Sequence, residues 1–400
     1  MMFLASAVHS YFHLADEQTH TTGNYTFTTQ TYFGAPMQLG AGHMIFTNPL
    51  HTPLKMPIGK YAILGFTGDI VDENHEPVPL DSAYDHHWIA KNDVHRNQLC
   101  NKGLEYVFGI GAESRNNPVN FPAGFGYLVE SGVTWGANVH LLRTEGLAGD
   151  NPHKAAKMCN ECYYAPGKGA QCTPAQNGTF KCCGENDNAG ISHCPVDPRA
   201  ALPNRTYHLR YSLNFTREVS KVTPLSVGVL STPKCATYYE VLRDNAKKID
   251  TSTYEWTCPT DVDVHFAVGH QHTGAINISL SRNGEFVCAS VARYGTQPSV
   301  AGDEKGYLVE MSSCIDESTG PLKLKKGDRL RLDALYYVGD DDDRVAYSDG
   351  THLNVMSYLY VGYMLAGRGA RDASEVDLIT GERLRGRVER WYETSTSIVR

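Results

Sequence analysis

Residues 256–279 constrain the fold more than any other stretch of the chain. They read WTCPTDVDVHFAVGHQHTGAINIS, and apolar residues alternate there with Asp, His and Ala at a period of two. The alternation predicts a half-buried β-strand, because successive side chains of a strand point to opposite faces. His270 and His272 follow at i and i+2. On a strand both imidazoles would lie on one face, as two ligands of one metal ion require. Without a metal, the same pair would be surface histidines beside a turn.

The rest of the chain has the composition of a β protein. Its 400 residues include 41% hydrophobic residues, 23 Tyr, 37 Gly and 19 Pro. Turn residues recur between short apolar runs, which favours short strands over long helices. A chain of this length exceeds one comfortable hydrophobic core. We therefore predict an all-β protein with two β-sandwich domains, residues 1–222 and 223–400, the second ending in a tail with charges of both signs.

Charge and hydropathy exclude several classes of partner. The formal net charge is −8, and the basic residues are scattered along the chain. This pattern gives no electrostatic surface for a nucleic acid or an anionic membrane. No stretch approaches the roughly 18 continuous apolar residues of a transmembrane helix. The start, MMFLASAVHSYF, lacks a basic segment, and we interpret it as a remnant of a signal peptide or a truncated one.

Cysteines and glycosylation sequons predict a secreted protein. The chain has 11 Cys, an odd number that leaves at least one thiol outside any internal pair. Five Asn-x-Ser/Thr sequons are acceptors for N-glycans in the secretory pathway, where disulfides also form. The sequons are at Asn24, Asn177, Asn204, Asn214 and Asn277.

Six of the cysteines lie in an insert within residues 151–200, which has almost no large apolar residue. Such a segment cannot build its own core, so we predict that disulfides hold it together. A zinc site is the alternative. The six are Cys159, Cys162, Cys172, Cys182, Cys183 and Cys194. In the second half the even set Cys235, Cys258, Cys288 and Cys314 is compatible with two bridges.

Three further segments contain candidate metal ligands. His86 and His87 are adjacent in DSAYDHHWIA, and His140 lies in the apolar run VTWGANVHLLRT. Neighbours on a regular strand face opposite sides, so His86 and His87 reach one metal only at a strand end or a bulge, or through different ring nitrogens. A lone histidine on an apolar strand is typical of a hydrogen-bonded core residue. Met356 in THLNVMSYLY is likewise typical of core filling.

The order of these residues resembles the copper type II, ascorbate-dependent monooxygenases, the group of peptidylglycine hydroxylating monooxygenase and dopamine beta-monooxygenase. The resemblance implies two copper ions. His86, His87 and His140 would hold the first, and His270, His272 and Met356 the second. A thioether favours Cu(I) and suits a site that binds dioxygen, whereas an all-imidazole set suits an electron relay.

The resemblance also identifies candidate catalytic residues. Tyr360 keeps a tyrosine of the peptide-hydroxylating enzymes, and Tyr358 stands where those enzymes have an asparagine. Val268 stands where they have an arginine, so a clamp for a peptide carboxylate is not expected here. The identity of the substrate is therefore left open, and we expect a small or peptide-like molecule.

A closer resemblance, over most of the chain, is to the stress up-regulated nodulin proteins. It rests on YDHHWIA, ANVHLLRTEG, the Cys-Cys insert followed by YHLRYSLNF, and HQHTGAINISL. It implies two tandem antiparallel jelly-roll domains, and the chemistry of that family is poorly defined.

We therefore expect a secreted, copper- and O₂-dependent monooxygenase that hydroxylates a C–H bond with ascorbate as reductant. The alternative is a non-catalytic glycoprotein of the cell surface or wall that keeps the fold as a binding or structural module. A glycan amidase of the same fold would need paired carboxylates, and no such pair stands out.

Overall fold

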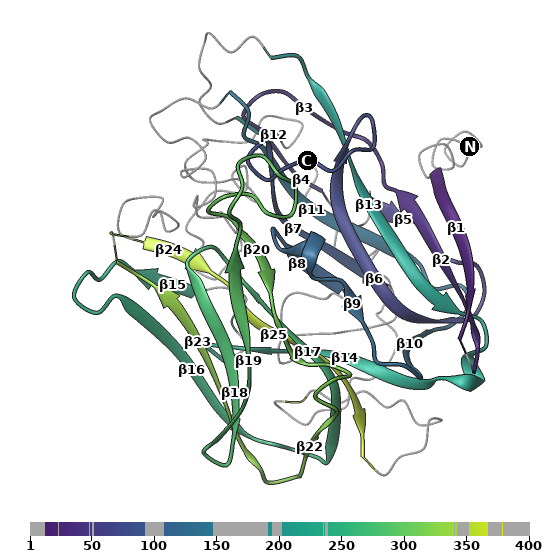
Figure 1. Cartoon of the computed structure of the whole chain (residues 1–400), viewed down its shortest axis with the longest axis vertical. Coiled ribbons are helices and arrows are strands. Elements are labelled where there is room, and N and C mark those ends of the chain that lie inside the picture. The colour runs from purple at the N-terminus through teal and green to yellow at the C-terminus, as the bar shows by residue number, and fades with distance from the viewer. Residues whose placement is uncertain are drawn as a thin grey trace, which may run out of the picture.

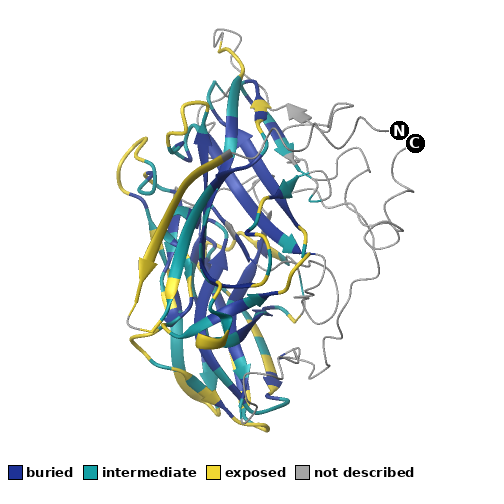
Figure 2. Ribbon diagram, turned by 90° about the vertical axis from the view of Figure 1, so that its right-hand side faces the viewer, coloured by how far each residue is buried: buried dark blue, intermediate teal, exposed yellow. Residues whose placement is uncertain are grey.

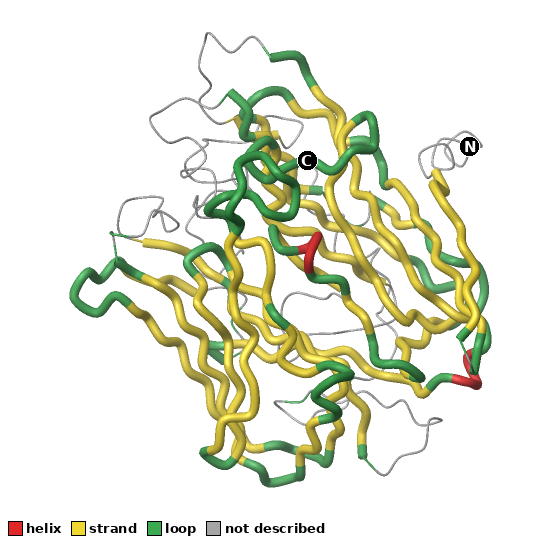
Figure 3. The backbone as a smooth tube through the Cα atoms, viewed as in Figure 1, coloured by secondary structure: helices red, strands yellow, loops and turns green. Residues whose placement is uncertain are grey.

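The computed structural model describes residues 13–22, 24–47, 49, 52–92, 108–146, 191–193, 202–234, 236, 239–339, 341, 352–366 and 378. These residues form strands joined by turns (Figure 3). They contain no α-helix, only the short 3-10 helices η3 (Ser114–Asn116) and η6 (Val219–Lys221). The predicted all-β class is therefore confirmed, whereas the jelly-roll connection of the strands stays a prediction. No helix within these ranges is long and apolar enough to cross a membrane.

Two sheets make up the part of the structure before residue 223 (Figure 1). One contains β1 (His13–Thr21), β2 (Thr26–Phe33), β3 (Met37–Leu39), β6 (Tyr61–Asp72), β9 (Val119–Asn120), β10 (Phe125–Val129) and β13 (Arg205–Thr216). The other contains β4 (His43–Phe46), β5 (Pro53–Leu54), β7 (Ala83–Asn92), β8 (Phe108–Gly111), β11 (Trp135–Arg143) and β12 (Ile191–His193). Phe66 of β6 packs on Trp88 and Phe108 of the other sheet, with ring centroids 5.4 and 4.9 Å apart. Aromatic residues thus fill the space between the sheets.

The part from residue 223 onward is also layered. One layer contains β14 (Thr223–Ser231), β17 (Val262–Gln271), β21 (Ser313–Ile315), β22 (Leu322–Leu324) and β25 (Ser357–Leu365). The second contains β16 (Ile249–Thr257), β18 (Ala275–Arg282), β19 (Glu285–Tyr294), β20 (Leu308–Met311) and β23 (Arg329–Tyr337), beside the pair β15 (Tyr239–Leu242) and β24 (His352–Val355). Buried residues run along the inner strands of both parts (Figure 2).

One sheet is continuous across the predicted domain boundary. β10 pairs in parallel with β14, from Phe125 opposite Thr223 to Tyr127 opposite Leu225, and β14 pairs antiparallel with β25. The resulting 12-stranded sheet includes strands from both parts. Among the ladders between named strands, β10–β14 is the parallel one. The division at residues 222 and 223 stays a prediction.

β17 differs in one respect from the expected half-buried strand. Its described residues from Val264 to Gln271 are all buried, so both faces are covered. β18 lies on one side, where a Cβ on Gly269 would come within 2.7 Å of Ile278 Cγ2. On the other side Phe121, from the preceding half, packs against Phe266 with ring centroids 5.9 Å apart. A bulge between Val264 and Phe266 turns Phe266 to the face expected to meet solvent, and the first half of the chain covers that face. The prediction that this face is polar and exposed was therefore wrong.

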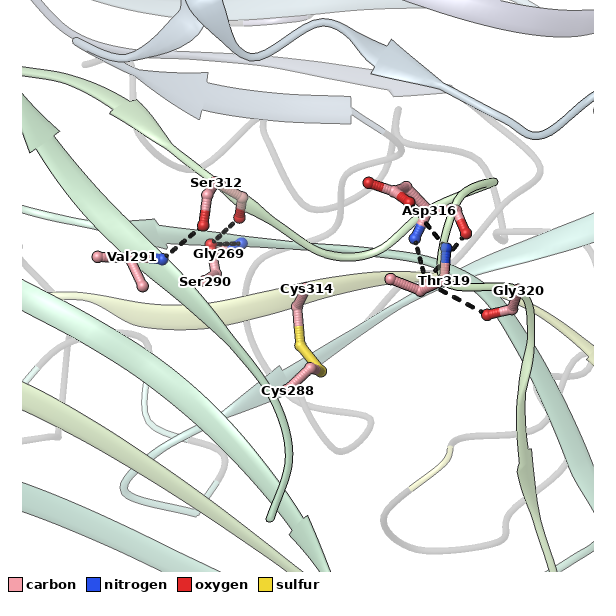
Figure 4. The surroundings of a disulfide bond; sticks show 9 residues. All are labelled: Gly269, Cys288, Ser290, Val291, Ser312, Cys314, Asp316, Thr319 and Gly320. Atoms are coloured by element: carbon pink, nitrogen blue, oxygen red, sulfur yellow. Dashed lines mark hydrogen bonds between the residues drawn. A yellow bond between two sulfur atoms is a disulfide. The ribbon is translucent and has the colours of Figure 1, made fainter.

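A disulfide joins Cys288 of β19 to Cys314 of β21 (Figure 4). Beside it, the Ser290 hydroxyl accepts a hydrogen bond from Gly269 N–H at 2.9 Å and donates to the Ser312 carbonyl at 2.5 Å. These contacts fix the backbone directly before His270. The expectation of a second bridge through Cys258 was wrong, because its thiol is free and buried and donates to the Thr260 carbonyl at 3.1 Å. Burial raises the pKa of that thiol.

Several sequence predictions fall outside the described residues. These are the six-cysteine insert, the amino-terminal apolar run, Cys235 and the charged tail, apart from a few scattered positions.

Candidate metal centre

A bulge brings His86 and His87 to the same site. On β11, His140 lies opposite His87, while the next residue, Leu141, lies opposite Asp85, so His86 is the extra residue of β7. A bulge of this kind redirects a side chain that regular pleating would send to the other face. The two Nδ1 atoms are 3.3 Å apart. His86 and His87 can therefore reach one metal ion, because they lie at a bulge.

His140 completes a buried group of three imidazoles. One nitrogen from each of His86, His87 and His140 lies within 4.8 Å of the others. His86 and His87 are each 6% exposed and His140 is fully buried. Three neutral imidazoles are a common donor set for copper, zinc and related ions. These three residues fit a metal ion, and we call them the histidine triad.

Neighbouring side chains set the orientation of the triad. His87 Nε2 is 2.8 Å from Asn138 Oδ1, so the ring N–H at Nε2 donates to that amide oxygen and Nδ1 is left as the metal-binding nitrogen. The Asn138 amide group donates in turn to the Thr47 carbonyl. The Thr47 hydroxyl accepts from Val139 N–H at 2.9 Å. His87 is thereby tied to the backbone of β11 and of the residue that follows β4.

His270 is held by a carboxylate that the sequence analysis did not identify. Its Nδ1 is 2.5 Å from Glu113 Oε1, and both side chains are nearly fully buried. A ring N–H donated to a carboxylate leaves Nε2 to bind a metal. The segment with Glu113 is docked on β20: Asn117 donates to the Met311 carbonyl and accepts from Met311 N–H at 2.8 Å. The pairing of this loop with β20 thus positions Glu113 against His270.

The second predicted set adjoins the triad. The rings of His272 and His86 have centroids 4.9 Å apart, although they come from different halves of the chain. The His272 and His270 rings are 5.8 Å apart. The structure thus places rings of the two histidine sets in contact.

Met356 lies at the same end of the second half as His270 and His272. β17 pairs with β25 so that His270 is opposite Tyr358, and Met356 directly precedes β25. The Tyr336 hydroxyl accepts from His272 N–H at 2.9 Å and donates to the Met356 carbonyl at 2.5 Å, which joins the two backbones. The Met356 side chain packs in an apolar cluster with Ile89, Val229 and Tyr358. Its ligation of a metal therefore stays a prediction.

The two candidate catalytic tyrosines flank His270. The ring centroids of Tyr358 and Tyr360 are 5.9 and 6.2 Å from that of His270. A cavity of about 460 Å³ lies farther along β17. It is lined by Phe266 and Val268, which share the His270 face of the strand. Polar residues, among them Asn117 and Glu310, also line it.

Gly111 lies between residues of the two histidine sets. A Cβ there would lie 2.6 Å from the His86 carbonyl oxygen and 3.1 Å from His270 Cε1. We predict that Gly111→Ala displaces the bulge and lowers the affinity of the triad for a metal ion by about tenfold or more, measured by chelator competition. Gly109→Ala on the same strand is the control, because its nearest neighbour is the Ile89 Cγ1 atom at 3.2 Å. Equal metal affinities of the two variants would contradict the requirement for glycine at position 111.

Three polar or sulfur partners of the histidines escaped the sequence analysis. Met44 contacts His140, Asn138 contacts His87, and Glu113 contacts His270. Asn138 had a usable signal, because it is two residues before His140 and shares its side of β11. Met44 and Glu113 had none, since they are separated from their partners by 96 and 157 residues.

Two solved structures show distant similarity to this chain. The PBCV-1 virus capsid quasi-atomic model aligns over 88% of this chain and 99% of the other, with 9% identity and a TM-score of 0.29. The structure of infectious bursal disease virus Gt strain aligns over 89% of this chain and 74% of the other, with 9% identity and a TM-score of 0.19. TM-scores this low establish no common fold. No curated protein matches the sequence.

A family model covers most of the sequence. The model described as Stress up-regulated Nod 19 matches residues 25–99 and 90–361. The matched residues include the histidine triad, His270, His272 and Met356. The chain belongs to the stress up-regulated Nod 19 family.

Proposed function

We propose that this protein is a secreted copper-binding protein and an ascorbate-driven, O₂-dependent monooxygenase that hydroxylates a C–H bond of a small or peptide-like substrate. The observation that supports copper binding most directly is the buried histidine triad, with its nitrogens within 4.8 Å of one another. Copper, when bound, would supply one-electron redox chemistry and the activation of dioxygen, with ascorbate as the source of electrons. Two ions per chain are proposed, one at the triad and one at His270, His272 and Met356.

The side chains around the two sites would hold and orient the ligands. Asn138 keeps the proton of His87 on Nε2, and Glu113 keeps that of His270 on Nδ1. Burial of all these groups excludes bulk water from the ligands. The 4.9 Å contact between His86 and His272 would give electrons a short path between the sites.

The substrate would lie in the cavity along β17. Phe266 and Val268 offer an apolar surface that leads toward His270. Tyr358 and Tyr360, beside His270, would position the reacting group with their hydroxyls and rings. The absence of a cation at Val268 argues against recognition of a carboxylate at that position.

Secretion is part of the proposal. The disulfide between Cys288 and Cys314 supports it, because such bonds persist mainly in oxidising compartments. Asn24 and Asn204 are exposed and fit the expected N-glycans.

Copper content tests the binding part of the proposal. We expect the purified wild-type protein, loaded with Cu(I) and desalted, to retain two copper ions per chain by elemental analysis. His140→Ala should lose one of them, because it removes a triad ligand. Wild-type protein that retains no copper would refute the proposal.

Oxygen consumption tests catalysis. Met356→Leu keeps the volume of the side chain and removes its sulfur, so the folding cost should stay below about 1.5 kcal/mol. If Met356 is a ligand, the variant should fold normally yet lose Cu(I) affinity and ascorbate-driven oxygen consumption. If wild-type protein consumes no more oxygen than free copper across a broad substrate panel, and Met356→Leu leaves copper content unchanged, the non-catalytic glycoprotein is the better explanation.

A further inference from the structure

Met44 is not a member of the histidine triad, but its side chain contacts His140. Its sulfur is 3.0 Å from Nε2 of His140. The Met44 side chain is 1% exposed and His140 is fully buried. Apolar packing places heavy atoms about 3.5–4.0 Å apart, so this approach is closer than packing alone gives. The contact is therefore directional, with the Nε2–H of His140 donating to the thioether.

Packing from both halves of the chain fixes the sulfur in place. Met44 belongs to a buried cluster with Leu80, Tyr84, Leu142, Tyr307 and Val309. Its strand, β4, pairs with β11 so that Met44 is opposite Leu142, two residues from His140 on the same face. The side chain therefore has little freedom to turn away from the imidazole.

The contact assigns a tautomer to His140. A proton on Nε2 leaves Nδ1 without one, and an imidazole nitrogen binds a metal only in that form. Asn138 imposes the same tautomer on His87. His87 and His140 thus both direct Nε2 away from the centre of the triad.

The choice of acceptor has a chemical consequence. An imidazole that ligates a metal usually donates its other N–H to a carboxylate, a carbonyl or water, and this raises the electron density on the ligating nitrogen. A thioether is a much weaker acceptor. His140 is therefore a weaker donor than His87, and weaker donation from nitrogen favours Cu(I) over Cu(II).

We propose that Met44 is a positioning residue of the triad, which selects the Nε2–H tautomer of His140 and raises the reduction potential of copper bound there. This inference rests on the proposed function for its copper part, while its tautomer part concerns the metal-free protein. Met44 itself is not assigned as a ligand.

The tautomer is tested without metal. In the apo protein, ¹⁵N NMR of the histidine side chains, with His140 assigned from the spectrum of His140→Ala, should show a proton on Nε2 and none on Nδ1. Met44→Leu should move the Nε2–H resonance, and Met37→Leu, which removes another buried methionine of the same half, should not. A proton on Nδ1 in the wild type would overturn the inference even if copper binds.

The potential is tested with copper bound. Met44→Gln places a stronger oxygen acceptor at the same position, so it should lower the reduction potential and raise Cu(II) affinity about tenfold. Met44→Leu should raise the reduction potential and lower the affinity for Cu(II). A purely structural role predicts the same potential in all folded variants, and that result would overturn the inference. If the apo spectra agree with the tautomer but wild-type protein binds no copper, the proposed function fails and the contact between Met44 and His140 stands.

Discussion

His87→Ala should abolish copper binding at the triad, lowering affinity there by about a hundredfold or more. The variant removes one of three buried nitrogen ligands, and loss of a direct ligand exceeds the 10- to 100-fold effect typical of outer partners. It also leaves the Asn138 amide oxygen without its donor, which should cost about 1–3 kcal/mol of folding free energy. Isothermal titration with a Cu(I) chelator measures the affinity, and thermal melting measures the folding cost.

The matched control is His208→Ala. His208 is a half-buried histidine of β13 whose Nδ1 hydrogen-bonds to the Gly34 carbonyl at 2.9 Å, away from the triad. The His208→Ala variant should be less stable than the wild type and should retain its copper. Equal loss of copper from both variants would mean that binding depends on the general integrity of the fold and not on the triad.

Glu113→Ala should weaken the second copper site by about 10- to 100-fold, since it removes the buried acceptor that orients His270. The measurement is best made on the His87→Ala background, where copper at the triad no longer contributes. Glu113→Gln keeps an oxygen acceptor of similar shape, so it should recover part of the affinity.

Glu130→Ala controls for the loss of a carboxylate. Glu130 is exposed and pairs with Lys60 at 2.6 Å on the surface, where such pairs contribute little. If Glu113→Ala bound the second copper as tightly as Glu130→Ala does, His270 would not depend on its carboxylate partner.

Local patterns in the sequence predicted the strands, whereas the two sets of candidate ligands came from the family resemblance. The alternation predicted a strand that leads into the HxH motif, and β17 includes His270 but ends at Gln271, so His272 lies directly after the strand. The rule for adjacent histidines gave a bulge as one of the ways for His86 and His87 to reach the same site, and β7 has that bulge. Such local inferences are possible because the side-chain direction on a strand depends on the residue's own neighbours in the chain.

The contacts between distant segments were beyond such patterns. Glu113 reaches His270 because a loop of the first half docks on β20 of the second. His86 meets His272 through the same packing of the two halves. Period-two alternation reports which faces are apolar and not which segment covers them, and for this reason β17 was expected to be half exposed.

The parallel pairing of β10 with β14 bears on how the protein leaves the ribosome. β14 begins at Thr223, just after the strands of the first half, so it can cover the bare edge of β10 as soon as it is synthesised. The other edge of β14 stays unpaired until β25 is synthesised, since Ser226 pairs with Tyr363. A nascent chain stalled between these points would present an unpaired strand edge, a template for aggregation.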